Sequence, residues 1–171
     1  MIVADLVAEW LEVRGISQAF GIIGGGNARL WDAIHRRGAT SLVCCHHEQA
    51  AAQAATYYQR VCGKVALTLV TSGAGSTNAI TGVMAAWADS VPLLVISGNE
   101  SSKYFDAPGR CFGFQGYRAA DLARHFTKLA VTMIPGACTH ERLTSYLDVA
   151  TEGRGGPVWL DFPKDVQNAM A

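Results

Sequence analysis

The 171-residue sequence has no excess of either charge and no long apolar run. Its 14 basic residues balance 14 acidic ones, which gives no electrostatic reason to expect nucleic acid or an anionic membrane as a partner. The longest apolar runs, such as 65–70 and 91–96, fall short of the roughly 20 residues that a membrane-spanning helix needs. Asp5 and Glu9 interrupt the N-terminal apolar stretch, which therefore does not resemble a signal peptide. The sequence predicts a cytoplasmic protein.

A cysteine pattern typical of disulfide-bonded or zinc-binding proteins is also absent. The five cysteines are odd in number and scattered, with no Cys-x-x-Cys pair, so neither a disulfide framework nor a zinc knuckle is supported. A chain of this length buries roughly two thirds of the surface that its unfolded form exposes, and it needs no such crosslinks. We expect one globular domain spanning residues 1–171. The informative excess is in glycine, because 18 glycines indicate backbone that approaches a neighbour or ligand closely.

Helical and strand-like segments alternate along the chain. Apolar residues at helical spacing, with glycine as the stop signal, predict helices over 2–13, 30–38, 49–60, 77–88, 117–126 and 140–151. Short apolar runs predict buried strands over 18–21, 40–45, 65–70, 92–97, 129–133 and 158–162. The pattern predicts an α/β fold, a three-layer doubly wound domain whose mostly parallel six-stranded sheet is flanked by helices. Ligands of such sheets bind beyond the carboxyl ends of the strands.

Three loops follow predicted strands and should therefore lie on one rim of the sheet. They are the glycine cluster 24–26, the segment 45–49 and the small-residue segment 71–78. The glycine cluster lacks the Gly-x-Gly-x-x-Gly spacing of a dinucleotide site, and the third loop lacks the lysine of a nucleotide-binding P-loop. A tight turn is the alternative explanation for both glycine-rich segments.

Glu48 stands out because it lies between an apolar strand and an alanine-rich helix. A carboxylate there either caps the helix N-terminus, which the helix dipole favours, or lies half-buried and shares a proton with a ligand nitrogen. His46 and His47 adjoin it, but neighbouring strand residues point to opposite faces and no third ligand has suitable spacing. The sequence therefore predicts no metal site on this chain.

Five motifs occur in order along almost the whole chain. They are Phe-Gly-Ile-Ile-Gly-Gly-Gly-Asn at 20–27, His-Glu-Gln-Ala-Ala at 47–51, Thr-Ser-Gly-Ala-Gly-Ser-Thr-Asn at 71–78, Ala-Asp-Ser-Val-Pro-Leu at 88–93 and Gly-Pro-Val-Trp-Leu-Asp-Phe-Pro-Lys-Asp-Val-Gln at 156–167. Together they resemble the pyrimidine-binding domain of thiamine-diphosphate-dependent 2-oxo-acid decarboxylases and carboligases. The resemblance is greatest to the acetolactate (acetohydroxyacid) synthase branch.

The resemblance implies a cofactor, thiamine diphosphate, and a catalytic residue, Glu48. In that family the matching glutamate hydrogen-bonds N1′ of the cofactor's aminopyrimidine and favours the imino tautomer that deprotonates the thiazolium ring. The implied cofactor-binding residues are Ile23, Gly24, Glu48, Thr71, Ser72, Gly73 and Asn78. The side that faces the 2-oxo-acid substrate would carry Gly25, Phe114 and Gln115.

Departures from the family pattern bear on the reaction. Gly25 stands where pyruvate decarboxylases of the family carry an aspartate, which favours ligation of the acyl carbanion to a second carbonyl over simple decarboxylation. Simple decarboxylation, as in sulfopyruvate or phosphonopyruvate decarboxylases, is the first alternative. A catalytically silent scaffold is the second, kept open by Tyr57 where a glycine is common. Gly116 and His46 replace residues usual in the synthase branch and indicate a different acceptor substrate.

The sequence contains no Gly-Asp-Gly, the start of the motif with which the family binds Mg²⁺ and the cofactor's diphosphate. We therefore expect a second subunit that carries the diphosphate-binding and Mg²⁺-binding domain and shares the thiamine diphosphate. The chain would then be the small subunit of a split enzyme, inactive alone, rather than an excised fragment. Two small and two large subunits give the simplest closed assembly, a heterotetramer in which the small subunits pair.

Overall fold

The computed structural model describes residues 1–105 and 115–171, in which six strands form one sheet. The strand order is β2-β1-β3-β4-β6-β5, and every adjacent pair is parallel. The strands are β1 (Gln18–Gly21), β2 (Ser41–Cys44), β3 (Leu67–Val70), β4 (Leu93–Asn99), β5 (Leu129–Thr132) and β6 (Pro157–Pro163). The predicted α/β class and the parallel six-stranded sheet are confirmed.

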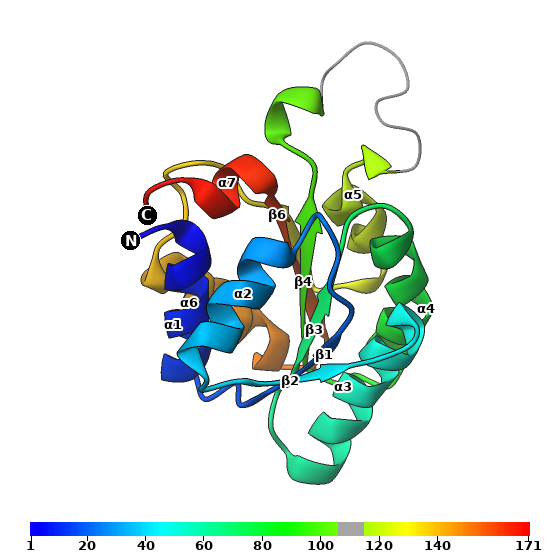
Figure 1. Cartoon of the computed structure of the whole chain (residues 1–171). Coiled ribbons are helices and arrows are strands. Elements are labelled where there is room, and N and C mark those ends of the chain that lie inside the picture. Colours follow the sequence, from blue (N-terminus) through cyan, green and yellow to red (C-terminus); the bar gives the residue numbers. More distant parts are fainter. Residues whose placement is uncertain (106–114) are drawn as a thin grey trace.

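Helices cover both faces of the sheet and give the molecule three layers (Figure 1). One face carries α1 (Val3–Val13), α2 (Ala28–Arg37), α6 (His140–Thr151) and α7 (Lys164–Asn168). The other carries α3 (Glu48–Cys62), α4 (Ala74–Ala88) and α5 (Ala119–Ala123). Short 3₁₀ turns occupy Ser102–Tyr104 and Arg124–Phe126. No helix in the two described stretches combines the length and the apolar character needed to cross a bilayer.

Two apolar cores lie on opposite faces of the sheet. One joins α1, α2 and α6 to the strands and includes Trp10 and Leu30, and the other joins α3, α4 and α5 to them and includes Trp159. Small residues let α3 and α4 pack closely, because a β-carbon on Gly82 would lie only 2.5 Å from Cβ of Ala52. This close packing brings the N-terminal ends of α3 and α4 side by side at the rim of the sheet.

The strand predicted over 40–45 is not buried, which corrects the sequence-based expectation. β2 is an edge strand that pairs only with β1 among the described strands, and three of its four residues are exposed. Only Leu42 among them packs partly against a core. An apolar run indicates a strand, but it does not distinguish an edge position from a central one.

The start of α4 also differs from the prediction. The helix begins at Ala74 rather than at 77, so the second half of the predicted turn at 71–76 is already helical. Gly73 is the N-cap residue and has φ 64° and ψ −125°, a conformation that residues with a side chain avoid. The glycine therefore lets the chain turn directly from β3 into α4.

Candidate active site

The carboxyl ends of β1, β2 and β3 bring the three predicted loops together at one rim of the sheet. The backbone N–H of Gly26 donates a hydrogen bond to Oγ1 of Thr71 at 3.0 Å, which joins the first loop to the third. Nδ2 of Asn78 donates to Oε2 of Glu48 at 3.0 Å, which joins the third loop to the second. The shared rim expected from the sequence is therefore present.

Glu48 is the first residue of α3, and only 8% of it is exposed. It is more buried than the half-buried position predicted from the sequence. The N-cap of α3 is His47, whose Nδ1 accepts a hydrogen bond from the N–H of Gln49 at 3.2 Å. The Glu48 carboxylate is instead directed at α4, where Oε2 bonds Asn78. Within residues 1–105 and 115–171, Oε1 has no hydrogen-bond partner.

Gly75 borders this second carboxylate oxygen. A β-carbon on Gly75 would lie 3.3 Å from Oε1 of Glu48 and 2.7 Å from Cγ2 of Thr71. The missing side chain leaves the approach to Oε1 open, while Asn78 holds the other oxygen in place. A carboxyl group presented in this way can accept one hydrogen bond from a ring N–H when it is ionised, or donate one to a ring nitrogen when it is protonated. The residues present therefore fit the aminopyrimidine that the resemblance implies.

The glycine cluster after β1 is a hydrogen-bonded turn. The N–H of Gly24 donates to Oδ1 of the buried Asn27 at 2.7 Å, and Nδ2 of Asn27 donates to the carbonyl of Ile22 at 3.0 Å. Asn27 thus fixes the loop from inside. Ile23 is 53% exposed, and no atom lies within 4 Å of the place where Gly25 would carry a β-carbon. Both residues are therefore accessible to a ligand at the rim.

The positions of the other predicted site residues give less information about ligand binding. Phe114 lies outside the residues that the structure describes, and Gln115 is exposed. Ser72 is 8% exposed, and its carbonyl accepts a hydrogen bond from the N–H of Gly75 at 3.3 Å, so it shapes the turn before α4. The contacts of Thr71, Ser72 and Gly73 with a cofactor remain predictions.

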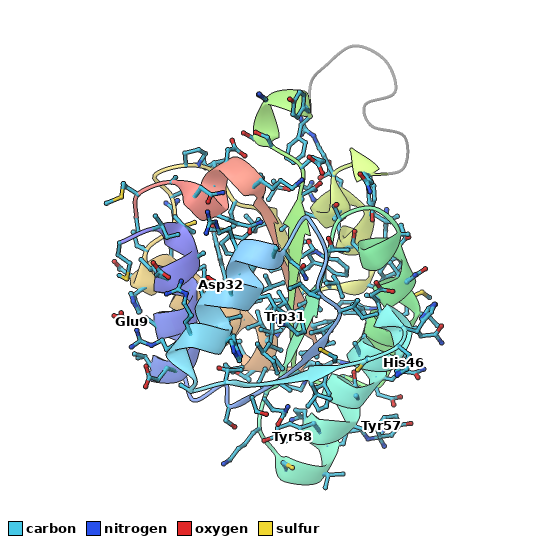
Figure 2. All side chains as sticks on the ribbon, in the orientation of Figure 1. Glu9, Trp31, Asp32, His46, Tyr57 and Tyr58 are labelled. Carbon is cyan, nitrogen blue, oxygen red and sulfur yellow. The ribbon has the colours of Figure 1, made fainter. Side chains whose placement is uncertain are left out.

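The side chains of His46 and Tyr57 do not occupy the space beside the Glu48 carboxylate. Figure 2 shows His46 beside the start of α3 and Tyr57 projecting away from that helix. Tyr57 is 60% exposed, and the guanidinium of Arg60 lies 5.5 Å from the centroid of its ring. The tyrosine that replaces a glycine of the family pattern therefore leaves the surroundings of Glu48 open. In the described parts of the chain, no three His, Cys, Asp or Glu residues form a group that could hold a metal ion.

Sequence reasoning missed a buried polar network beneath the rim. Asp161, near the carboxyl end of β6, is fully buried, and it accepts hydrogen bonds from Oγ of Ser97 at 2.5 Å and Nδ2 of Asn99 at 2.7 Å. Nε1 of Trp159 donates to the Ser97 hydroxyl at 2.8 Å, and Asn99 also donates to the carbonyl of Tyr117 at 3.0 Å. The one signal in the sequence was an acidic residue inside an otherwise apolar strand.

Burial raises the pKa of Asp161 to about 6, although hydrogen bonds from Ser97, Asn99 and Thr132 oppose the shift. The folded protein therefore binds this proton more tightly than the unfolded chain, in which the pKa is near 3.8. This contribution to stability is complete below about pH 4 and is lost as the pH rises through about 6, by at most about 3 kcal/mol.

We expect Asp161→Asn to abolish this loss of stability between about pH 4 and about pH 7. Urea unfolding of both proteins at about pH 4 and about pH 7 measures it, and an unchanged pH dependence in the variant would contradict the assignment.

Comparison with known proteins gives a family and several relatives. Residues 1–116 match the family model described as thiamine pyrophosphate enzyme, N-terminal TPP binding domain. The chain is 37% identical over 165 residues to the acetolactate synthase large subunit of Haemophilus influenzae and 35% identical over 168 residues to the isozyme 3 large subunit of Escherichia coli. Each alignment covers 96% of this chain and 28% of the relative. The mitochondrial acetolactate synthase of Schizosaccharomyces pombe is 38% identical over 156 residues, which are 90% of this chain and 22% of that protein.

Proposed function

Because this chain belongs to the thiamine pyrophosphate enzymes, we propose that it supplies the catalytic glutamate, Glu48, to an enzyme that decarboxylates a 2-oxo acid. The resulting acyl carbanion is then ligated to a second carbonyl. The observation that carries the proposal is the buried Glu48 carboxylate, with Oε2 bonded to Asn78 and Oε1 open beside Gly75. The relatives are named acetolactate synthases, which supports an acetolactate-synthase-like reaction.

Thiamine diphosphate, when bound, supplies a heterocycle that stabilises the carbanion left by decarboxylation. In the proposal Glu48 holds a proton at Oε1 and exchanges it with a ring nitrogen, while Asn78 keeps the carboxylate oriented. The backbone of 71–75 and the turn at 23–24, in which Ile23 is exposed, form the walls that contact the cofactor. Their small or exposed residues allow a close approach.

The substrate side of the site is assigned to Gly25, Phe114 and Gln115. Gly25 is exposed with open space around it and carries no acid that could protonate an acyl carbanion. This favours ligation over simple decarboxylation, because a carbanion that is not protonated survives to attack a second carbonyl.

We further propose that the diphosphate and Mg²⁺ are held by a domain of a partner subunit, so that the cofactor lies between two chains. The 171 residues contain no Gly-Asp-Gly, the start of the motif with which the family binds the diphosphate and Mg²⁺, which supports this division of labour. Two copies of this chain and two partner subunits would form a heterotetramer in which the copies of this chain pair.

Reconstitution tests the proposal. This chain, combined with the product of a neighbouring reading frame that carries Gly-Asp-Gly, is expected to release CO₂ from pyruvate in the presence of thiamine diphosphate and Mg²⁺. Analysis of the products separates ligation, which gives an acyloin-type product, from plain decarboxylation, which gives an aldehyde. A stable complex that releases no CO₂ from any 2-oxo acid would contradict the proposal and leave the scaffold alternative.

A further inference from the structure

A pair of hydroxyl groups ties the start of α4 to the segment that contains Tyr117. Oη of Tyr117 lies 2.7 Å from Oγ of Ser76, and each hydroxyl lies 3.1 Å from the carbonyl oxygen of Gly73. Each hydroxyl has one hydrogen, so one donates to the other and the second donates to Gly73. Burial raises the pKa of the Tyr117 hydroxyl, which therefore keeps its proton at neutral pH.

The Gly73 carbonyl lies at the base of the turn that supports Glu48. It accepts a hydrogen bond from the N–H of Thr77 at 3.1 Å, which is part of the first turn of α4. The same turn carries Gly75, which borders Oε1 of Glu48, and leads to Asn78, which bonds Oε2. The position of this carbonyl therefore determines how α4 meets the Glu48 carboxylate.

The backbone of Tyr117 is itself held in place by a hydrogen bond. Its carbonyl accepts a hydrogen bond from Nδ2 of Asn99 at 3.0 Å, and the same amide group donates to the fully buried Asp161 at 2.7 Å. The buried network beneath the rim thus fixes the main chain of Tyr117. Its side chain extends that fixed point to the start of α4.

We propose that Tyr117 is a positioning residue whose hydroxyl holds the first turn of α4 against Glu48. Gln115, assigned to the substrate side, lies two residues earlier in the chain, so one tether connects the substrate side with the proton-exchanging carboxylate. The inference rests on the proposed function, because this support has a catalytic consequence only when Glu48 is catalytic.

Two substitutions test this tether, the hydrogen bonds of the Tyr117 hydroxyl to Ser76 and Gly73, without the partner subunit. They leave different hydrogen bonds intact. Tyr117→Phe removes every hydrogen bond between that side chain and α4, whereas Ser76→Ala leaves the Tyr117 hydroxyl able to donate to Gly73. We expect amide hydrogen exchange at Thr77 and Asn78 to quicken about fivefold in Tyr117→Phe and less than about twofold in Ser76→Ala. Equal exchange rates in the two variants would overturn the tether.

Steady-state kinetics of the chain reconstituted with its partner subunit test the catalytic consequence. Tyr117→Phe is expected to lower kcat for CO₂ release about tenfold and to leave KM for the 2-oxo acid within about twofold. The control is Thr127→Val, because Oγ1 of the buried Thr127 donates to the carbonyl of Ala123 at 2.9 Å, away from the Glu48 carboxylate. Thr127→Val is expected to change neither constant.

The outcomes separate this inference from the proposed function. A reconstituted wild-type protein that releases no CO₂ contradicts the proposed function, and with it the catalytic role of Tyr117, before any variant is compared. An active wild type together with a fully active Tyr117→Phe variant contradicts this inference alone. A raised KM with unchanged kcat would also overturn it, because that result indicates direct contact of Tyr117 with the substrate.

Discussion

Glu48→Gln is expected to slow CO₂ release by the reconstituted protein about 10²- to 10⁴-fold, the usual contribution of a group that transfers a proton during the reaction. Glutamine has nearly the same shape, and its amide oxygen can still accept the hydrogen bond from Asn78. Its amide nitrogen would then face the opening beside Gly75 and could neither release nor bind a proton. The substitution therefore keeps the packing and removes the chemistry. Initial rates at saturating cofactor and 2-oxo acid measure the effect.

A second acidic residue in the first turn of a helix provides the control. Glu141 lies in the first turn of α6, is exposed, and has no ion pair among the described residues. If Glu48 acts only through the helix dipole, Glu48→Gln and Glu141→Gln should both cost less than about 1 kcal/mol of stability and leave the rate unchanged. A fully active Glu48→Gln protein would remove this residue from the proton exchange.

Gly98→Ala is expected to destabilise the protein by about 3 kcal/mol or more. Gly98 lies in β4 directly beneath the first loop of the rim. A β-carbon there would lie 2.0 Å from the carbonyl oxygen of Gly26, 2.2 Å from its carbonyl carbon and 2.6 Å from the backbone nitrogen of Asn27. All three atoms belong to the backbone, so no side chain can rotate away to relieve the overlap. Urea unfolding followed by circular dichroism measures the loss.

Gly25→Ala is the matched control for the same loop. No atom lies within 4 Å of the β-carbon position at Gly25, and its φ is outside the left-handed range. We expect the free energy of unfolding to change by less than about 0.5 kcal/mol. If the two variants were equally stable, the close approach of β4 to the glycine turn would be wrong.

The order of elements and the position of the rim could be predicted because both depend on local signals. Helices between strands require crossover connections, which make neighbouring strands parallel and bring the loops after them to one edge of the sheet. Glu48 was identifiable because a carboxylate interrupts the change from an apolar strand to an alanine-rich helix. Its burial follows from the close packing of α3 and α4 at Gly82.

Contacts between distant side chains could not be predicted in the same way. The hydrogen bond from Asn78 to Glu48 joins residues 30 positions apart, and that from Tyr117 to Gly73 joins residues 44 apart. Neither tyrosine nor asparagine at these positions has a local pattern that indicates its partner. From the sequence, Asn78 was expected only among the cofactor-binding residues, whereas the structure shows its side chain bonded to Glu48.

The order of the strands in the sheet could not be predicted from the sequence either. The runs 40–45 and 92–97 are similarly apolar, yet β2 lies at the edge and β4 in the middle. Strand order arises from the way helices and strands pack in three dimensions, and the composition of a single run does not encode it. The same limit explains why the exposure of β2 was predicted wrongly.

The position of β6 between β4 and β5 affects how the chain can fold while it is being synthesised. Among the described strands β5 pairs only with β6, and it leaves the ribosome first because it precedes β6 in the chain. β6 also supplies Leu160 to one core and Trp159 to the other. A nascent chain in which β6 is still inside the ribosome lacks the strand that pairs with both β4 and β5 and that completes both cores. In that state association with other chains competes with folding.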